Sequence, residues 1–438
     1  MSPKPVTIQL RRGFTLLELL VVIAIIGILA SLTIAVMNGV TDQALREATK
    51  ATVQKVNGLL QQRIESFDRS FTGERREQAI KNVRNVLETA IIAAEGNPFL
   101  LSENETAMSI LAKKLEFRFQ FPQRVQDRLG APYSRDPQAT GTGSLVVLPP
   151  GGVPLPQSLY EEILFPVARA ELLEEQVVTL PLDASERNLI DARVSQKWAN
   201  HDRDTESSEL LYFALIRSRI FGASVSGADE FSGSEIDDTD NDGLPEFVDA
   251  WGTPLQFYRW PTRLIDNDSP VPFDPVLSNL NDPTDLRTSS NPTGREITDS
   301  ERRVAGILLK GLPPAPGTIS AVQQREFLLV DPDDPVGIVY QFLEDPPNVS
   351  MGINLHNYIN EDTFHTIDTF HTPLIVSAGV DGITGLYEPW RTETGILGIL
   401  AQPAGTNFAS ASTIPTQAVE DAMRDNVTNR NRRAGGQR

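Results

Sequence analysis

An acidic loop carries the clearest metal-binding pattern in the chain. Over residues 238–249, oxygen-bearing groups recur at loop positions 1, 3, 5, 7, 9 and 12, with Gly243 at position 6. Calcium takes roughly six to eight oxygen ligands, and a glycine at position 6 permits the sharp turn of such a loop. The expected calcium ligands are Asp238, Asp240, Asp242, the Leu244 carbonyl, Glu246 and Asp249.

Two features separate this loop from the usual calcium-binding loop. Asp249 replaces the longer glutamate at the twelfth position, and this shorter side chain is expected to weaken a bidentate contact. No helical pattern flanks the loop on both sides. The alternative is a solvated acidic loop, in which the clustered carboxylates repel one another.

A single carboxylate inside a long apolar stretch is the second chemically unusual feature. Residues 14–36 are almost wholly apolar, and Glu18 is their only charged residue. A helix of this length is about 35 Å long and crosses a bilayer core of about 30 Å. An ionised acid within a membrane helix costs about 2.5–3.5 kcal/mol, so Glu18 is expected to have a charged partner.

Ordinary export signals explain this stretch poorly. A secretory signal ends at an Ala-x-Ala-like cleavage site, and none follows the apolar run. The pair Arg11 and Arg12 also fits a twin-arginine signal, and a plain signal anchor is a further alternative. Each of these alternatives leaves Glu18 unexplained.

The stretch Arg11-Arg12-Gly13-Phe14-Thr15-Leu16-Leu17-Glu18 resembles the cleavage and methylation signal of type IV prepilins and type II secretion pseudopilins. The resemblance implies that prepilin peptidase cuts after Gly13 and methylates Phe14. It also implies that Glu18 pairs with the Phe14 amine of a neighbouring subunit during filament assembly. Ala35 departs from the family, which often has a proline there.

Two later stretches also resemble major pseudopilins. Residues 249–254, Asp-Ala-Trp-Gly-Thr-Pro, are similar to the stretch that opens the family's sheet. Residues 377–382 are similar to the start of the family's calcium loop. Asp381 and Glu388 are therefore weaker metal candidates, because the paired aspartates that normally follow are missing.

The apolar pattern predicts a long N-terminal helix and several shorter helices. Beyond a soft point at Asn38-Gly39, apolar residues recur at three- and four-residue steps. This stripe comprises Leu45, Thr49, Val53, Val56, Leu60, Ile64 and Phe67. Further helices are expected at 74–95, 106–118, 158–176, 184–199 and 206–221.

Short strand patterns follow Gly227. They lie at 255–260, 304–309, 327–330, 337–343 and 374–376. We expect an α+β fold in which the long N-terminal helix, with a transmembrane half and an amphipathic half, packs on a small antiparallel sheet. The expected parts are a leader (1–13), the N-terminal helix (14–66), a helix-rich insertion (67–230), a pilin-like β domain (231–400) and a flexible basic tail (401–438).

Composition limits the classes of partner and chemistry. The 438 residues carry a formal net charge of −19 and no cysteine, which disfavours nucleic acid as a partner of the main body and excludes disulfides. No nucleotide-binding, serine-hydrolase or zinc-protease motif is present, so we expect no enzyme activity.

His365 and His371, with His356 as a third ligand, form a weak zinc candidate. The alternative is that these histidines lie on a polar edge strand.

The sequence therefore predicts a structural subunit of a type II secretion pseudopilus or a type IV pilus-like filament. The resemblance implies an inner-membrane, single-pass precursor with its body in the periplasm or cell exterior. Its expected partners are prepilin peptidase, other copies of itself, other pseudopilins, the assembly platform and the membrane, with calcium as a cofactor. The alternatives are a minor tip-located pseudopilin or adhesive pilin, and a membrane-tethered enzyme or binding protein that uses the same export signal.

Overall fold

The structure is a computed structural model. It describes residues 16–93, 104–128, 159–217, 228–259, 373–390 and 416–430, with the short pieces 262–263, 338–339, 369–370, 401 and 404. Within these residues the chain is rich in helix and has small antiparallel sheets. The strands expected at 304–309 and 327–330 lie outside the described residues, as do His356, His365 and His371.

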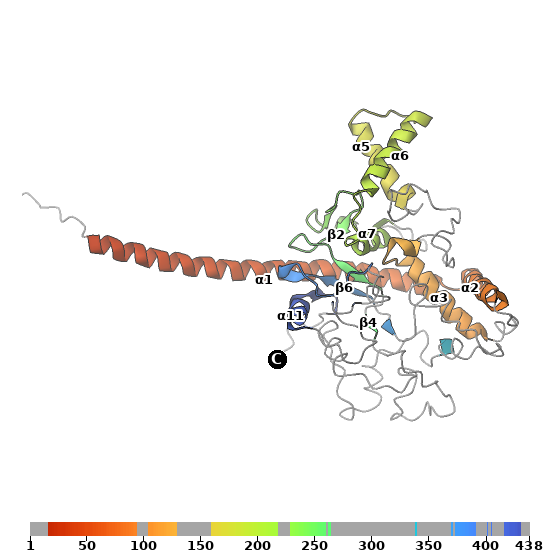
Figure 1. Cartoon of the computed structure of the whole chain (residues 1–438), viewed down its shortest axis with the longest axis horizontal. Coiled ribbons are helices and arrows are strands. Elements are labelled where there is room, and N and C mark those ends of the chain that lie inside the picture. The colour runs from red at the N-terminus through yellow and green to blue at the C-terminus, as the bar shows by residue number, and fades with distance from the viewer. Residues whose placement is uncertain are drawn as a thin grey trace, which may run out of the picture.

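One helix, α1 (Leu16–Ser70), runs from outside the body into its core (Figure 1). It has 55 residues and is therefore about 80 Å long. The backbone stays helical through Asn38-Gly39, where the sequence indicated a soft point. No helix among the described residues combines the length and apolarity of a membrane span. The membrane-crossing part of the expected helix is thus not confirmed.

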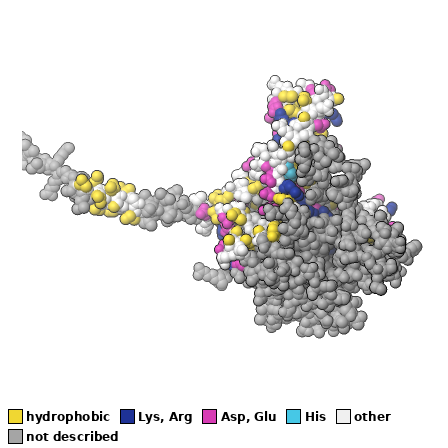
Figure 2. Space-filling view, in the orientation of Figure 1, with side chains coloured by type: hydrophobic (Ala, Val, Ile, Leu, Met, Phe, Trp, Pro, Cys, Tyr) yellow, Lys and Arg dark blue, Asp and Glu magenta, His cyan; other side chains and the backbone are white. Residues whose placement is uncertain are grey.

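The two ends of α1 have different surroundings. Near the N-terminus the large apolar side chains are exposed, from Leu16 at 81% to Leu29 at 58%. Figure 2 shows apolar side chains around the part of α1 that projects from the body. In the C-terminal half, the predicted stripe is buried at Thr49, Val53, Val56, Leu60 and Phe67, which confirms the amphipathic pattern.

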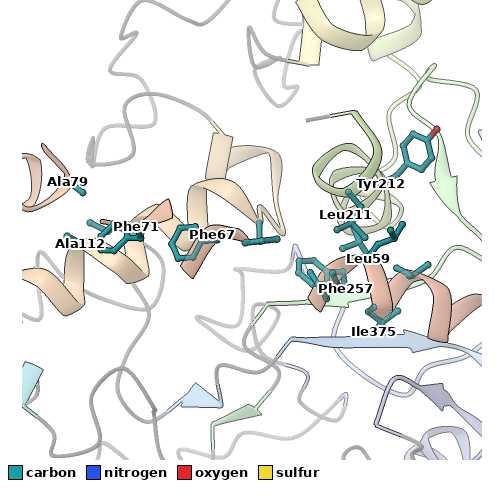
Figure 3. Close-up of a cluster of buried hydrophobic side chains, with 14 of the residues drawn as sticks. Leu59, Phe67, Phe71, Ala79, Ala112, Leu211, Tyr212, Phe257 and Ile375 are labelled. Carbon is teal, nitrogen blue, oxygen red and sulfur yellow. The ribbon is translucent and has the colours of Figure 1, made fainter. Parts of the chain in front are cut away.

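The main core forms around this C-terminal half of α1 (Figure 3). Leu59 lies near Leu211 of the helical insertion and near Phe257 and Ile375 of the sheet. Further along α1, the Phe67 ring stacks on Phe71 and meets the rings of Phe117 and Phe121 edge-on. Residues from both halves of the sequence therefore share one core with α1.

The central sheet is antiparallel and has the strand order β3-β6-β7. Its strands are β3 (Gln256–Tyr258), β6 (Leu374–Ser377) and β7 (Val427–Thr428). Phe257 pairs with Ile375, and Ser377 pairs with Val427. Two-residue pairs form separately between β1 (Ile236–Asp237) and β2 (Glu246–Phe247), and between β4 (Thr262–Arg263) and β5 (Thr369–Phe370).

The expectation of a flexible C-terminal tail is wrong for residues 416–430. This part forms helix α11 (Gln417–Asp425) and strand β7, and Val427 is buried in the main core. The Asn429 side chain also accepts a hydrogen bond from the Ile375 amide and donates one to Asn57 of α1. Tertiary contacts thus order a segment whose local sequence is polar.

The prediction of a strand at 337–343 is wrong at residues 338 and 339, which are helical.

The expected helix-rich insertion is helical in the parts described. It contains α2 (Gly73–Ala93), α3 (Glu105–Gln120), α5 (Phe165–Glu174), α6 (Ala184–Trp198) and α7 (Glu206–Tyr212). Short 3-10 and π-helical turns adjoin them at Val125–Arg128, Tyr160–Leu164, Phe213–Arg217 and Ala228–Glu230. Helices α5 and α6 pack as a pair that projects from the body, and α7 lies against β2 and β3 (Figure 1).

Candidate metal-binding site

The acidic loop at residues 238–249 begins directly after β1 and includes β2, two short strands that the sequence did not predict. Aspartate side chains fold the loop onto itself: Asp240 Oδ1 accepts from the Asp242 amide at 3.0 Å, and Asp238 Oδ2 accepts from the Gly243 amide at 3.0 Å. Gly243 has a φ of +91°, which L side chains rarely adopt. A Cβ there would also lie 3.1 Å from the Lys197 side chain. Glycine is therefore required at the sixth position of the loop.

Three of the predicted calcium ligands converge. Asp238, Asp240 and Glu246 each direct one carboxylate oxygen to within 4.8 Å of the others. Glu246 is fully buried, and Asp238 Oδ1 is buried without a hydrogen-bond partner. A buried oxygen without a hydrogen-bond partner, next to two further carboxylates, is expected where a cation binds through oxygen ligands.

The electrostatics of these carboxylates favour a bound cation. Burial, together with the neighbouring Asp240 and Asp238, raises the pKa of Glu246 to about 8. Burial and the nearby Asp240 also raise the pKa of Asp238. Without a counter-charge, the ionised forms are penalised, whereas a divalent cation would stabilise them.

The other predicted ligands lie differently. The buried Leu244 stays within the loop, and its amide donates to Asp242 Oδ1 at 2.6 Å. Asp249 does not belong to the group of three converging carboxylates. It accepts from Ser377 Oγ at 2.7 Å and from the amides of Trp251 and Thr253. The predicted twelfth ligand thus joins a turn to strand β6 in this structure.

Asp242 belongs to a second group of side chains. Its Oδ2 atom lies 2.8 Å from Nδ1 of His201, in the segment between α6 and α7. One ligand atom each from His201, Glu209, Asp240 and Asp242 lies within 4.8 Å of the others. Asp240 is thus common to both groups of metal-ligating side chains.

His201 is held in a fixed orientation at this second group. Its ring stacks on Trp198, with centroids 4.1 Å apart and planes 12° apart. Burial alone would lower the pKa of His201, but Asp242, Glu206 and Glu209 raise it to about 12. The buried carboxylates Glu206 and Glu209 come from α7, which packs on β2.

The sequence analysis missed His201, Glu206 and Glu209 as site residues. A local signal exists, because residues 201–209 place one histidine among several acidic residues. Only the fold shows that this segment meets the acidic loop, since His201 and Asp242 are 41 residues apart. The histidines considered as zinc ligands were others, which lie outside the described residues.

The weaker metal candidates Asp381 and Glu388 belong to neither of the two groups found among the described residues. Asp381 is exposed in a 3-10 turn (Gly379–Asp381), and its Oδ1 atom accepts from the Ile383 amide at 2.8 Å. Glu388 is half-buried. In the part of the chain that the structure describes, neither residue belongs to a group of three or more close metal-ligating side chains.

The structure leaves the N-terminal processing residues mostly undescribed. Gly13 and Phe14 lie outside the described residues, and Glu18 lies on the α1 helix without a described side chain. The role of this segment therefore rests on its sequence.

One known family model matches the N-terminal segment. Residues 9–34 match the prokaryotic N-terminal methylation motif, and this range includes Gly13, Phe14 and Glu18. The match confirms the prepilin signal of type IV pilins and pseudopilins. The chain thus carries a signal that implies processing by prepilin peptidase and pilin-type assembly. Neither a known protein with an assigned role nor a solved structure matches the chain significantly.

Proposed function

We propose that this protein is a structural, non-enzymatic subunit of a type II secretion pseudopilus or a type IV pilus-like filament. The observation that carries the proposal is the methylation motif at residues 9–34, with Glu18 inside its apolar part. The cut after Gly13 frees the amine of Phe14. That amine is the cation that a carboxylate in apolar surroundings needs.

The shape of α1 supports assembly through this helix. Its N-terminal part exposes large apolar side chains, which a soluble monomer rarely does over a contiguous surface. Its C-terminal half is part of the core of the body. A bundle of such N-terminal helices would bury the exposed surface and carry the bodies on the outside of a filament.

Before assembly, the apolar segment would anchor the subunit in the inner membrane with a single pass. The leader carries Lys4, Arg11 and Arg12, and positive charges favour the cytoplasmic side. The body would then lie in the periplasm or at the cell exterior. Other pseudopilins and the inner-membrane assembly platform are the further partners of this proposal.

Calcium would stabilise the acidic loop in the body. Asp238, Asp240 and Glu246 are the ligands that the geometry favours, and the unpartnered Oδ1 atom of Asp238 supports their role. The loop lies between β1 and β2 and contacts α6 through Gly243 and Lys197. Bound calcium would therefore fix the position of the helical insertion relative to the sheet.

A minor subunit at the filament tip is the second candidate function. The projecting α5–α6 pair favours this candidate, because an added helical part is most easily accommodated at a free end (Figure 1). Glu18 favours the repeated subunit, since it provides the acid for stacking on the next molecule. One or a few copies per filament, counted by quantitative mass spectrometry, would favour the tip.

The test separates processing from assembly with the substitution Glu18→Ala. We expect the mature wild-type protein and the variant to begin at an N-methylated Phe14 by intact-mass analysis. Filaments should form in the wild type and fail in the variant, because the amine of the next subunit then lacks its counter-charge.

Glu47→Ala is the matched control, since Glu47 is exposed further along α1 and forms a local ion pair with Lys50 at 2.7 Å. It should assemble normally. A mature protein that begins elsewhere would refute the processing step, and normal filaments from Glu18→Ala would refute assembly through this carboxylate.

A further inference from the structure

The second group of side chains, His201 with Glu209, Asp240 and Asp242, differs in chemistry from the three converging carboxylates. It includes an imidazole nitrogen, whereas calcium is bound by oxygen ligands. A small set of nitrogen and carboxylate donors is the ligand type of zinc and related transition metals. The two groups are therefore suited to different cations.

The spacing of the donor atoms fits one tetrahedral ion. Zinc lies about 2.0–2.1 Å from nitrogen and oxygen ligands, so two ligands of a tetrahedron are about 3.3 Å apart. His201 Nδ1 lies 3.3 Å from Glu209 Oε2 and 2.8 Å from Asp242 Oδ2. Asp240 provides the fourth ligand, a third carboxylate, within the same 4.8 Å limit. The distance between His201 and Glu209 already matches that of two ligands of a tetrahedral ion, whereas Asp242 would have to move about 0.5 Å away from His201.

One buried carboxylate oxygen that makes no hydrogen bond points toward His201 in this group. Glu209 is 2% exposed, and its Oε2 atom has no hydrogen-bond partner. The other oxygen of Glu209 accepts from Thr205 Oγ1, so the carboxylate is held in place by its outer partner. Asp242 is likewise held by the Leu244 amide at its Oδ1 atom. Both carboxylates thus keep one oxygen directed toward His201.

The carboxylates around His201 outnumber the positive charge that the imidazole can carry, which also favours a bound cation. The carboxylates of Glu209 and Asp242 are buried beside His201, and Glu206 adds another, with Oε2 3.7 Å from His201 Nε2. Even a protonated imidazole neutralises only one of these charges. The Arg203 side chain supplies a further cation at this group, and its Nε atom lies 3.9 Å from Glu206 Oε2. Unpaired buried charge is costly, whereas a divalent ion would compensate it.

We propose that His201 Nδ1, Glu209, Asp242 and Asp240 form a structural zinc site beside the calcium loop, with Asp240 shared between the two cations. Four protein ligands, of which Glu209 and Asp242 are buried, give the closed geometry of a structural site. The ion would join the segment between α6 and α7 to the β1–β2 loop. Trp198 would set the imidazole plane, and Glu206 would neutralise the ring's Nε2 side.

The test uses the full-length mature protein in detergent. Metals are removed with a chelator, calcium is restored in excess to fill the oxygen group, and zinc alone is then added. We expect one tightly held zinc per chain after dialysis. X-ray absorption at the zinc edge should show one imidazole nitrogen together with oxygen ligands at about 2.0 Å.

His201→Gln and Asp238→Asn form a matched pair of variants. Losing an outer-shell partner lowers metal affinity roughly 10–100-fold. Because His201→Gln removes a direct ligand, it should lower the zinc affinity by more than that, and it should retain calcium binding. Asp238→Asn should retain the zinc and lose calcium binding, because Asp238 belongs only to the oxygen group. Retained calcium binding also shows that His201→Gln is folded.

The absence of stable zinc binding by the wild-type protein would overturn the proposal. A zinc spectrum with only oxygen ligands would also overturn it, and this measurement decides the matter even if His201→Gln fails to fold. Undiminished zinc binding by a folded His201→Gln variant would exclude His201 as the ligand. None of these outcomes depends on filament assembly, so a failure of the zinc site can be distinguished from a failure of the assembly proposal.

Discussion

At the scale of single residues, a pair of charged side chains connects α1 to the β1–β2 region. Glu235 accepts hydrogen bonds from Lys55 at 2.8 Å and from Thr52 at 2.8 Å, both on α1. Ser232 also donates to it through its amide. Burial opposes ionisation, but these donors lower the pKa of Glu235 to about 2. The ionised carboxylate therefore stabilises the folded state.

This pKa predicts a specific pH dependence for Glu235→Gln. The unfolded pKa is near 4.5, so the stabilisation is fully present above that pH and is lost as the pH falls toward 2. The variant should melt at a lower temperature than the wild type at pH 7. The difference should shrink progressively below pH 4.5 in thermal melts of the detergent-solubilised protein.

Glu47→Gln is the control for this experiment, because Glu47 is an exposed α1 residue with only a local ion pair. Surface pairs of this kind contribute about 0–1 kcal/mol. An equal difference between Glu235→Gln and wild type at pH 7 and at pH 2.5 would contradict the linkage to the Glu235 carboxylate.

The candidate metal site was only partly predictable at this scale. Asp238, Asp240 and Glu246 lie within one loop, so their spacing in the sequence is enough to indicate a shared site. His201 and Glu209 reach the loop through the packing of α7 on β2, which no local pattern encodes. Asp249 has the right spacing, but the register of β6 brings Ser377 to it instead.

At the scale of elements, helices were more predictable than strands. The stripe on α1 repeats over several turns, so its buried residues could be predicted individually. Strands β1, β2 and β7 have only two residues each, too few for an alternating pattern to indicate a strand. β7 depends on its pairing with β6 and on its contact with α1.

The buried stripe of α1 predicts a large effect for Leu60→Ala. Leu60 is fully buried in the main core, and truncating a buried leucine typically costs about 2–5 kcal/mol. Urea unfolding of the detergent-solubilised monomer should show this loss in the free energy of unfolding. Leu20→Ala, on the exposed part of the same helix, should change it by less than about 0.5 kcal/mol. Similar losses for both variants would contradict the division of α1 into an exposed part and a core part.

At the scale of the whole molecule, the acidic loop lies where separate parts of the chain meet. The projecting pair α5 and α6 reaches it through Lys197, and α7 reaches it through Glu209. On the other side, β2 continues toward the central sheet through the turn at Asp249. A cation in the loop therefore stabilises the arrangement of several elements together.

Calcium removal should consequently lower the melting temperature of the whole body. At a calcium concentration about 100 times the Kd, binding contributes about 2.7 kcal/mol. Thermal melts with and without chelator should differ in the wild type. They should coincide in Asp238→Asn, which lacks a carboxylate of the oxygen group.

Asp381→Asn is the control for calcium removal, because exposed Asp381 belongs to neither group of close side chains. It should keep the full chelator-dependent difference. A wild-type melt that does not respond to chelator would contradict calcium binding by the loop, and a lost response in Asp381→Asn would place the calcium elsewhere.

The continuity of α1 has a mechanical consequence. The helix passes without a break from its exposed apolar end to the buried residues that contact the central sheet. Tension applied to the N-terminal end would reach the hydrophobic interior without first stretching a loop. The strength of such a subunit under load is then set by the packing of Val53, Val56 and Leu60 rather than by any connecting linker.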